Sequence, residues 1–221
     1  QLHEPLISRS QGGVNGSHSE LTPYGEEFLK RYARFQKKHE TVQKKYLKIV
    51  SEDFLMRDLY LIRHGKPQYP DEHSYCIGQT DLPLSMLGHL QAVLLHEELS
   101  DKISAIYCSP LSRAVDTASH IAPALPHLTV SELSERNLGS WDGLSFDKIR
   151  QKWPAIYEAR GKNPECPIPG AETPLESGTR FSQAISRILH SSDSNIAVVA
   201  HTDVISFYLW MLYPEISDID R

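Results

Sequence analysis

Cysteine is scarce in this chain of 221 residues, which contains three cysteines and no pair spaced as CxxC. Cys76, Cys108 and Cys166 are widely separated and odd in number. That pattern argues against a disulfide framework and against a structural zinc site, and it favours a reducing compartment. We therefore expect a cytoplasmic protein whose fold needs no metal ion.

Long hydrophobic runs are missing as well. The longest apolar runs, such as 59–62 and 196–200, are far shorter than the roughly 18 residues of a membrane-spanning helix. No positively charged start leads into an apolar segment of the kind found in a secretory signal. The first residue is Gln1 rather than methionine, so removal of a segment upstream stays an open alternative.

Basic residues are outnumbered, with 23 Lys and Arg against 28 Asp and Glu, but the balance differs along the chain. Residues 1–50 hold nine basic and five acidic residues, whereas residues 51–221 hold fourteen and twenty-three. The change near Ser51 predicts a boundary between two parts. We expect a flexible segment over 1–21, a basic amphipathic helix over 22–52 and an α/β domain over 53–221.

The basic segment has the periodicity of one long helix. Thr22 and Pro23 supply an N-cap and a first-turn proline. Three interpretations of this helix stay open: it packs on the α/β domain, which we favour, it pairs in a dimer, or it contacts an anionic membrane surface. The net negative charge of the chain argues against nucleic-acid binding. The apolar seam consists of Phe28, Tyr32, Phe35, His39, Val42, Tyr46 and Ile49.

Beyond this helix, short apolar runs alternate with helical patterns. Such alternation predicts a three-layer α/β/α fold with a mostly parallel central sheet. The expected strands lie at 59–62, 105–108, 128–130 and 196–200, and the expected helices at 84–99, 110–121, 144–158, 178–191 and 204–212.

Cationic and imidazole side chains follow three of the expected strands. Arg63 and His64 come after the first strand, Arg113 lies one turn into the helix after the second, and His201 with Thr202 follows the last. Ligands of open α/β sheets bind at the carboxyl ends of the strands. Several partly buried positive groups at one edge are costly without an anion, so we expect a phosphate site there.

The same positions fall within five segments that resemble the histidine phosphatase superfamily, which has the phosphoglycerate-mutase-like fold. The resemblance covers roughly residues 57–213, and its segments occur in the family's order. They are LYLIRHGKP (59–67), GQTDLPLSMLGHLQA (78–92), SPLSRAVDTA (109–118), LSERNLGSWDG (133–143) and AVVAHTDVI (197–205).

The resemblance implies that His64 is the nucleophile and forms a phosphohistidine intermediate. It implies that Glu135 is the general acid and base, and that Arg63, Arg113 and His201 bind the phosphate without a metal ion or cofactor. The two arginines are expected to lower the pKa of His64 and keep it neutral for attack, whereas His201 is expected to be protonated against the phosphate dianion.

Further substrate contacts are predicted for Gly78, Gln79 and Thr80 in the GQTD stretch, through backbone or side chain. Thr202 stands where the family usually has glycine. It is expected either to cap the last helix or to donate to phosphate.

The loop after His64 departs from the family's pattern. The family often has a Ser or Thr three residues after the nucleophile and an Asn six residues after it, contacting phosphate, and this chain has Pro67 and Pro70. The phosphate contacts on that side are therefore not predicted. Tyr69, His73 and Tyr75 of the same loop are candidates for one wall of the substrate pocket.

The stretch between Glu135 and His201 is short, and residues 159–177 offer Arg160 and Lys162 as basic groups. Because mutases of the family hold a second phosphate with a long basic insertion, hydrolysis is favoured over transfer. We expect a phosphomonoesterase for a small phosphorylated metabolite, with a phosphoprotein as a second candidate substrate. A phosphoglycerate-mutase-type phosphotransferase, and a non-catalytic regulatory or binding relative that uses the N-terminal helix, are the alternatives.

Overall fold

The computed structural model describes residues 7–10, 18–21, 57–163 and 166–213. The chain divides into two compact units, Gln1–Leu55 and Met56–Arg221. In the first unit, β1 (Ile7–Ser10) pairs antiparallel with β2 (His18–Leu21). These two strands lie within the segment 1–21 that is predicted to be flexible, and the remainder of that segment lies outside the described residues, so its flexibility stays a prediction. The predicted helix over 22–52 lies outside the described residues.

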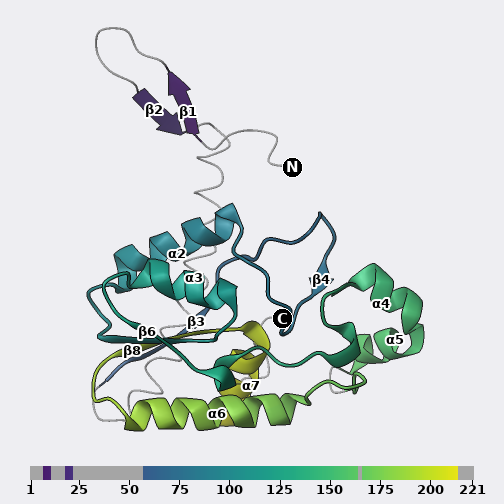
Figure 1. Cartoon of the computed structure of the whole chain (residues 1–221). Coiled ribbons are helices and arrows are strands. Elements are labelled where there is room, and N and C mark those ends of the chain that lie inside the picture. Colours follow the sequence, from purple (N-terminus) through teal and green to yellow (C-terminus); the bar gives the residue numbers. More distant parts are fainter. Residues whose placement is uncertain (1–6, 11–17, 22–56, 164–165, 214–221) are drawn as a thin grey trace. The chain divides into compact units, whose positions relative to one another are not determined.

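The second unit is built on a four-stranded parallel sheet in the order β3-β8-β5-β6 (Figure 1). All five residues of β8 are buried, as its unbroken apolar run indicates for a strand covered on both faces. The expected parallel α/β arrangement is thus confirmed. The strands are β3 (Leu59–Arg63), β5 (Ala105–Cys108), β6 (His127–Thr129) and β8 (Ile196–Ala200).

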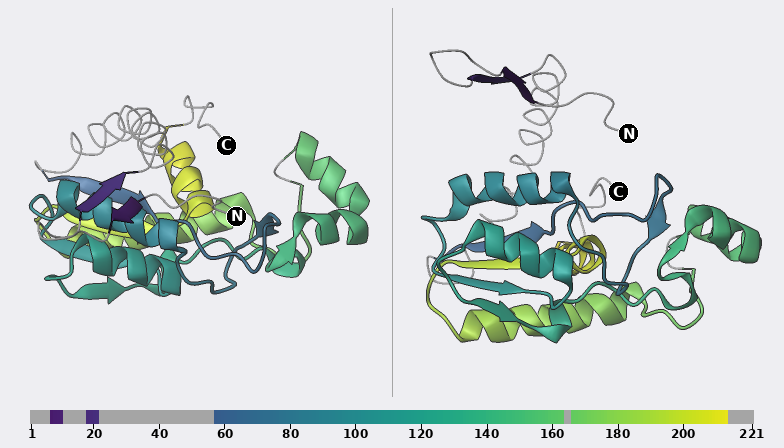
Figure 2. Two further views of the ribbon diagram at one scale, coloured as in Figure 1. Left: turned by 90° about the horizontal axis from the view of Figure 1, so that it is seen from above. Right: turned by 45° about the horizontal axis from the view of Figure 1, so that its top comes forward.

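Helices cover both faces of this sheet, which gives the three expected layers (Figures 1 and 2). The helices α2 (Met86–Leu99) and α3 (Ser112–Ile121) lie on one face. On the other face lie α6 (Pro174–His190) and α7 (Thr202–Leu212), whose Phe181 and Tyr208 rings are 5.5 Å apart. None of the described helices is both long and apolar enough to cross a membrane.

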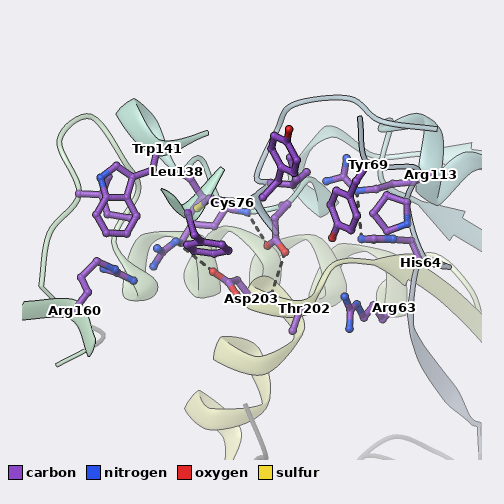
Figure 3. A pocket seen from close by; sticks show the side chains of 17 residues that line it. Arg63, His64, Tyr69, Cys76, Arg113, Leu138, Trp141, Arg160, Thr202 and Asp203 are labelled. Carbon is purple, nitrogen blue, oxygen red and sulfur yellow. Dashed lines mark hydrogen bonds and ion pairs between the residues drawn. The ribbon is translucent and has the colours of Figure 1, made fainter. Parts of the chain in front are cut away.

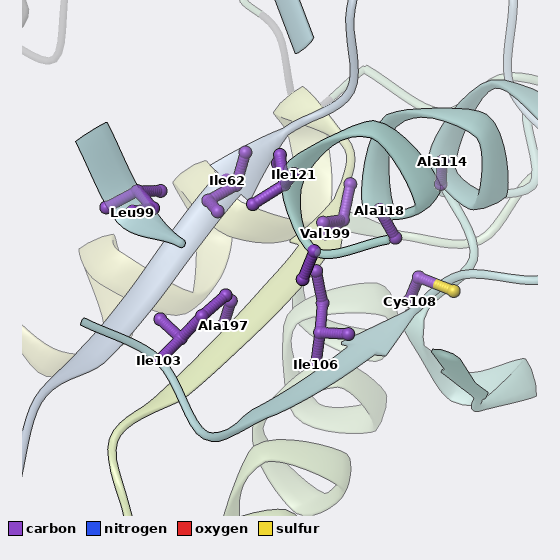
Figure 4. Packing of buried hydrophobic residues seen from close by; sticks show 11 residues of the cluster. Ile62, Leu99, Ile103, Ile106, Cys108, Ala114, Ala118, Ile121, Ala197 and Val199 are labelled. Atoms are coloured by element: carbon purple, nitrogen blue, oxygen red, sulfur yellow. The ribbon is translucent and has the colours of Figure 1, made fainter. Parts of the chain in front are cut away.

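The core between the sheet and α3 is packed from small and branched side chains (Figure 4). Ala114 and Ala118 are fully buried and present little bulk, so the helix backbone can lie close to the strands. Facing them are Ile62, Ile106, Cys108, Ala197 and Val199. This close packing fixes the position of α3 relative to the strand ends.

A smaller substructure lies beside the strand ends, and we call it the cap. In it β4 (Tyr75–Cys76) pairs antiparallel with β7 (Leu144–Ser145), followed by α4 (Phe146–Lys152) and α5 (Pro154–Lys162). The prediction of a single helix over 144–158 is wrong, because Pro154 has no N–H to continue α4 and begins a new helix instead. The cap has its own apolar cluster of Cys76, Leu138, Trp141, Ile149 and Ile168.

Candidate active site

The carboxyl ends of three neighbouring strands bring the predicted residues together. His64 follows β3, and its backbone N–H donates to the Ala200 carbonyl of β8 at 3.0 Å. His201 follows β8, and its ring centroid is 4.9 Å from that of His64. Arg113 in the first turn of α3 reaches His64 directly. The juxtaposition expected from the sequence therefore exists.

The His64 ring is held in one tautomer by its neighbours. Its Nδ1–H donates to the Gly65 carbonyl at 2.7 Å, and its Nε2 accepts from Arg113 Nε at 3.2 Å. Burial lowers the pKa of His64 to about 3, with the charges of Arg113 and Arg63 adding to that effect and the Gly65 contact opposing it. His64 is neutral as expected, but burial is a larger cause than the two arginines.

The loop that carries His64 is clamped between two helices. The Gly65 N–H donates to Thr117 Oγ1 of α3 at 3.0 Å, while Gly88 of α2 packs against Gly65 from the other side. A Cβ on Gly65 would lie 2.5 Å from the Gly88 carbonyl oxygen, closer than atoms can approach. Glycine at this position therefore sets the location of the nucleophile.

Arg113 is 1% exposed and has carbonyl groups as its partners. Its Nη1 donates to the Thr80 carbonyl at 2.9 Å, and its Nη2 to the Gly78 carbonyl at 2.7 Å. Burial lowers the pKa of Arg113, an effect that the charge of Glu135 opposes. Since carbonyls orient a guanidinium without neutralising it, the charge of Arg113 remains available to an anion.

The predicted substrate residues Gly78, Gln79 and Thr80 do not line the cavity described below. In the structure Gly78 and Thr80 position Arg113, and the side-chain amide of Gln79 donates to the Glu135 carbonyl at 3.2 Å. Their direct contact with substrate stays a prediction. The sequence analysis missed Asp142, which accepts from the backbone N–H groups of all three residues and fixes this loop.

His201 is fully buried, and neither ring nitrogen has a hydrogen-bond partner within the described residues. Burial, followed by the proximity of His64 and Arg113, holds the pKa of His201 well below its ordinary value. Protonation of His201 against a phosphate dianion stays a prediction. A bound dianion would favour the protonated imidazole and satisfy one of its nitrogens.

Glu135 is 6% exposed, and its carboxylate accepts three backbone N–H groups. Oε1 accepts from Arg136 at 2.8 Å and from Val204 at 3.3 Å, and Oε2 accepts from Asp203 at 3.2 Å. Burial and the neighbouring Asp203 charge raise the pKa of Glu135 to about 7, although the three N–H groups oppose that rise. A carboxyl group in this state can both donate and accept a proton near neutral pH.

These side chains open into a cavity of about 330 Å³ with two chemically different ends (Figure 3). The first end, which we call the histidine end, is lined by Arg63, His64, Arg113, Glu135 and Thr202. The side chain of Thr202 is exposed and does not cap α7, so the prediction that it caps the last helix is wrong. The second, the cap end, is lined by Cys76, Leu138, Trp141, Phe146, Ile168, Arg136, Arg160 and Asp203. Tyr69 and Tyr75 also line the cavity, whereas the third candidate of their loop, His73, does not.

The cap end contains two guanidinium groups. Arg136 is 2% exposed, its nearest carboxylate oxygen is 3.6 Å away on Asp203, and its Nε has no hydrogen-bond partner in the described part of the chain. Arg160 donates to the Cys166 carbonyl and lies over the Trp141 ring. The sequence analysis considered Arg160 with Lys162, but it is Arg136 that joins Arg160, and Lys162 does not line the cavity.

Across residues 57–163 and 166–213, together with the hairpin strands, no group of three or more His, Cys, Asp and Glu side chains is arranged to hold a metal ion.

Known proteins share both the sequence and the fold. The model of the histidine phosphatase superfamily (branch 1) matches residues 59–218. Phosphoglycerate mutase-like protein 4 of Arabidopsis thaliana is 35% identical over 164 residues, which are 70% of each chain. Phosphoserine phosphatase 1 of Hydrogenobacter thermophilus is 29% identical over 152 residues, 66% of this chain and 72% of that protein.

The mycobacterial glucosyl-3-phosphoglycerate phosphatase has the same fold. Its structure aligns with a TM-score of 0.64 and 28% identity over 72% of this chain and 80% of its own. The parallel sheet, the strand-end histidines and these similarities agree with one another, and the chain is a phosphatase that belongs to the histidine phosphatase superfamily.

Proposed function

We propose that this phosphatase hydrolyses small anionic phosphomonoesters through a phosphohistidine intermediate on His64, without a metal ion. The observation that carries the proposal is the neutral His64, whose Nε2 carries a lone pair and contacts the buried Arg113 at 3.2 Å. When substrate binds, the phosphoryl group lies next to Nε2 and takes over the Nε–H that Arg113 directs at this point.

In the first step, the Nε2 lone pair forms a bond to phosphorus while the bond from phosphorus to the ester oxygen breaks. Charge on the equatorial oxygens is stabilised by Arg113 and by Arg63, and by His201, which becomes protonated against the bound dianion. Glu135, protonated in part near neutral pH because its pKa is about 7, gives its proton to the leaving oxygen. The products are an alcohol and the phosphoenzyme.

In the second step, water attacks phosphorus and transfers a proton to Glu135, which is now a carboxylate. The phosphorus–nitrogen bond breaks, and its electron pair returns to Nε2. Inorganic phosphate leaves, and Glu135 is again protonated. One carboxyl group therefore serves as acid and then as base, which suits a pKa near the working pH.

The cap end supports a leaving group that carries an anion, such as a carboxylate. Arg136 and Arg160 supply two positive groups there, Asp203 lies 3.6 Å from Arg136, and the remaining lining of the cap end is apolar. Two of the three relatives named above are a phosphoserine phosphatase and a glucosyl-3-phosphoglycerate phosphatase, and serine and glycerate both bear a carboxylate. A cavity of about 330 Å³ also fits a small metabolite better than a folded phosphoprotein.

The test is phosphate release from O-phosphoserine, 3-phosphoglycerate and p-nitrophenyl phosphate in the presence of EDTA, with His64→Ala as the inactive control. We expect metal-independent turnover by the unaltered protein, and a loss of about 10⁴-fold or more in His64→Ala. Rapid quenching is expected to trap a phosphoenzyme that is labile in acid and stable in base.

Three results would contradict the proposal. Turnover that requires a divalent cation excludes the metal-independent mechanism. Transfer of phosphate between phosphoglycerates with little release indicates the phosphotransferase alternative. Binding of these esters without either reaction indicates the non-catalytic alternative.

A further inference from the structure

One wall of the cavity at the histidine end is poor in groups that can bind phosphate. It is formed by the loop that runs from His64 to Gly78, and two of its residues are prolines, Pro67 and Pro70, which have neither a backbone N–H nor a polar side chain. The loop residues that line the cavity are Pro67, Tyr69, Tyr75, Cys76 and Ile77.

Among those five lining residues, the two tyrosines carry the hydroxyl groups, and one hydroxyl is already engaged. Tyr75 donates its hydroxyl to Asp71 at 3.0 Å. Tyr69 lies beside Arg113 and His64 with its hydroxyl directed into the cavity (Figure 3). Tyr69 is thus the hydroxyl donor that this loop can offer to a group bound at the histidine end.

The position of Tyr69 is fixed by its surroundings. Its ring stacks on Tyr75 with centroids 6.0 Å apart and planes inclined by 11°. Tyr75 is held in turn by Asp71 and by its pairing with Ser145. Gln68, the residue before Tyr69, donates its backbone N–H to the Pro83 carbonyl at 2.8 Å. A donor held in this way loses little conformational freedom when it binds a ligand.

We propose that Tyr69 is a phosphate-binding residue, whose hydroxyl donates a hydrogen bond to an oxygen of the phosphoryl group bound next to His64. The proposal rests on the proposed function, since it places that phosphoryl group next to His64. A phenol is a suitable donor at this position because it is neutral. A further cation would add charge to a cluster that already contains Arg63 and Arg113, whereas a hydroxyl binds the anion without doing so.

The experiment compares Tyr69→Phe, which keeps the ring and its stacking, with Tyr107→Phe as a matched control. Tyr107 lies on β5, and its hydroxyl pairs with Ser191 at 3.3 Å, outside the cavity lining. Two quantities are measured for each protein: the Kd for inorganic phosphate by calorimetry, and kcat/KM for p-nitrophenyl phosphate. Thermal unfolding checks that both variants are folded.

We expect Tyr69→Phe to weaken phosphate binding about 10-fold and to lower kcat/KM about 10- to 100-fold, the range for a hydrogen bond to a charged group. Tyr107→Phe is expected to change both by less than 3-fold, within the small effect of a surface substitution. Phosphate binding by Tyr69→Phe equal to that of the unaltered protein would overturn the proposal, even if KM for bulky esters rises. An unaltered protein that does not bind phosphate would overturn it as well. Phosphate binding that depends on Tyr69 in a protein without turnover would uphold the contact and reject the hydrolase mechanism.

Discussion

The two ends of the cavity are built in different ways. At the histidine end, the reactive groups follow neighbouring strands of the parallel sheet, and His64, Arg113 and Glu135 each have partners from distant parts of the chain. At the cap end, the lining belongs largely to a separate substructure with its own apolar cluster. In the proposed mechanism, the reaction therefore belongs to the sheet and the choice of leaving group to the cap.

Apart from the loss of His64 itself, removal of the acid at the histidine end is expected to have the largest effect. Glu135→Gln cannot protonate the leaving oxygen, so kcat/KM for an alkyl phosphate should fall by about 10²–10⁴-fold. Because burial raises the pKa of Glu135 to about 7, its acid form is present below that pH and is lost above it. In the unaltered protein, kcat/KM should therefore decline as pH rises above 7, and this decline should be absent in Glu135→Gln.

The pH–rate profiles of the two proteins are measured between pH 5 and 9. A p-nitrophenyl leaving group needs little protonation, so its phosphorylation step should be affected far less by the substitution. Equal losses for both substrates would show that Glu135 is structural.

The same conservative substitution at each end provides the next comparison. Arg113→Lys should lower kcat/KM for every phosphomonoester by about 10²–10³-fold, because a lysine cannot contact His64 and the Gly78 and Thr80 carbonyls together. Arg160→Lys at the cap end should cost less than about 10-fold with p-nitrophenyl phosphate, which has no carboxylate. The measurement is the steady-state kcat/KM of both variants with p-nitrophenyl phosphate. Similar losses in the two variants would show that the two ends are not functionally distinct.

The last comparison concerns selectivity at the cap end. Replacing Arg136 or Arg160 with Met should reduce kcat/KM for O-phosphoserine by about 10- to 100-fold relative to an uncharged alkyl phosphate, since one charge-assisted contact is lost. The quantity to measure is the ratio of the two kcat/KM values. If this ratio is unchanged in both variants, the proposal that the leaving group carries a carboxylate is wrong.

Much of the fold could be predicted because its determinants are local. Runs such as 59–62 and 196–200 are apolar since the strands are buried on both faces, and the residues directly after them lie at one sheet edge by topology. This reasoning predicts the place of three site residues, which are His64, Arg113 and His201. The hairpin strands β1 and β2 were missed because their polar residues show no apolar alternation.

The other features of the site could not be predicted, because they depend on burial and on contacts between residues that are far apart in the sequence. Asp142 resembles any loop carboxylate until the folded chain brings it to three backbone N–H groups. Arg136 is adjacent to Glu135 in sequence, yet its place at the cap end follows from tertiary packing. The lowered pKa of His201 likewise results from burial, which cannot be read from a sequence motif.

The contact between Gly65 and Gly88 has a consequence for how this chain can evolve. A methyl group on either residue would enter the backbone of the other segment, at 2.5 Å from the Gly88 oxygen in one case and 2.2 Å from the Lys66 oxygen in the other. Neither position can therefore accept another residue unless the helix and the nucleophile loop move apart together. Met86 and Leu90 of the same helix are exposed and free to vary, so mutational tolerance along α2 changes within a single turn.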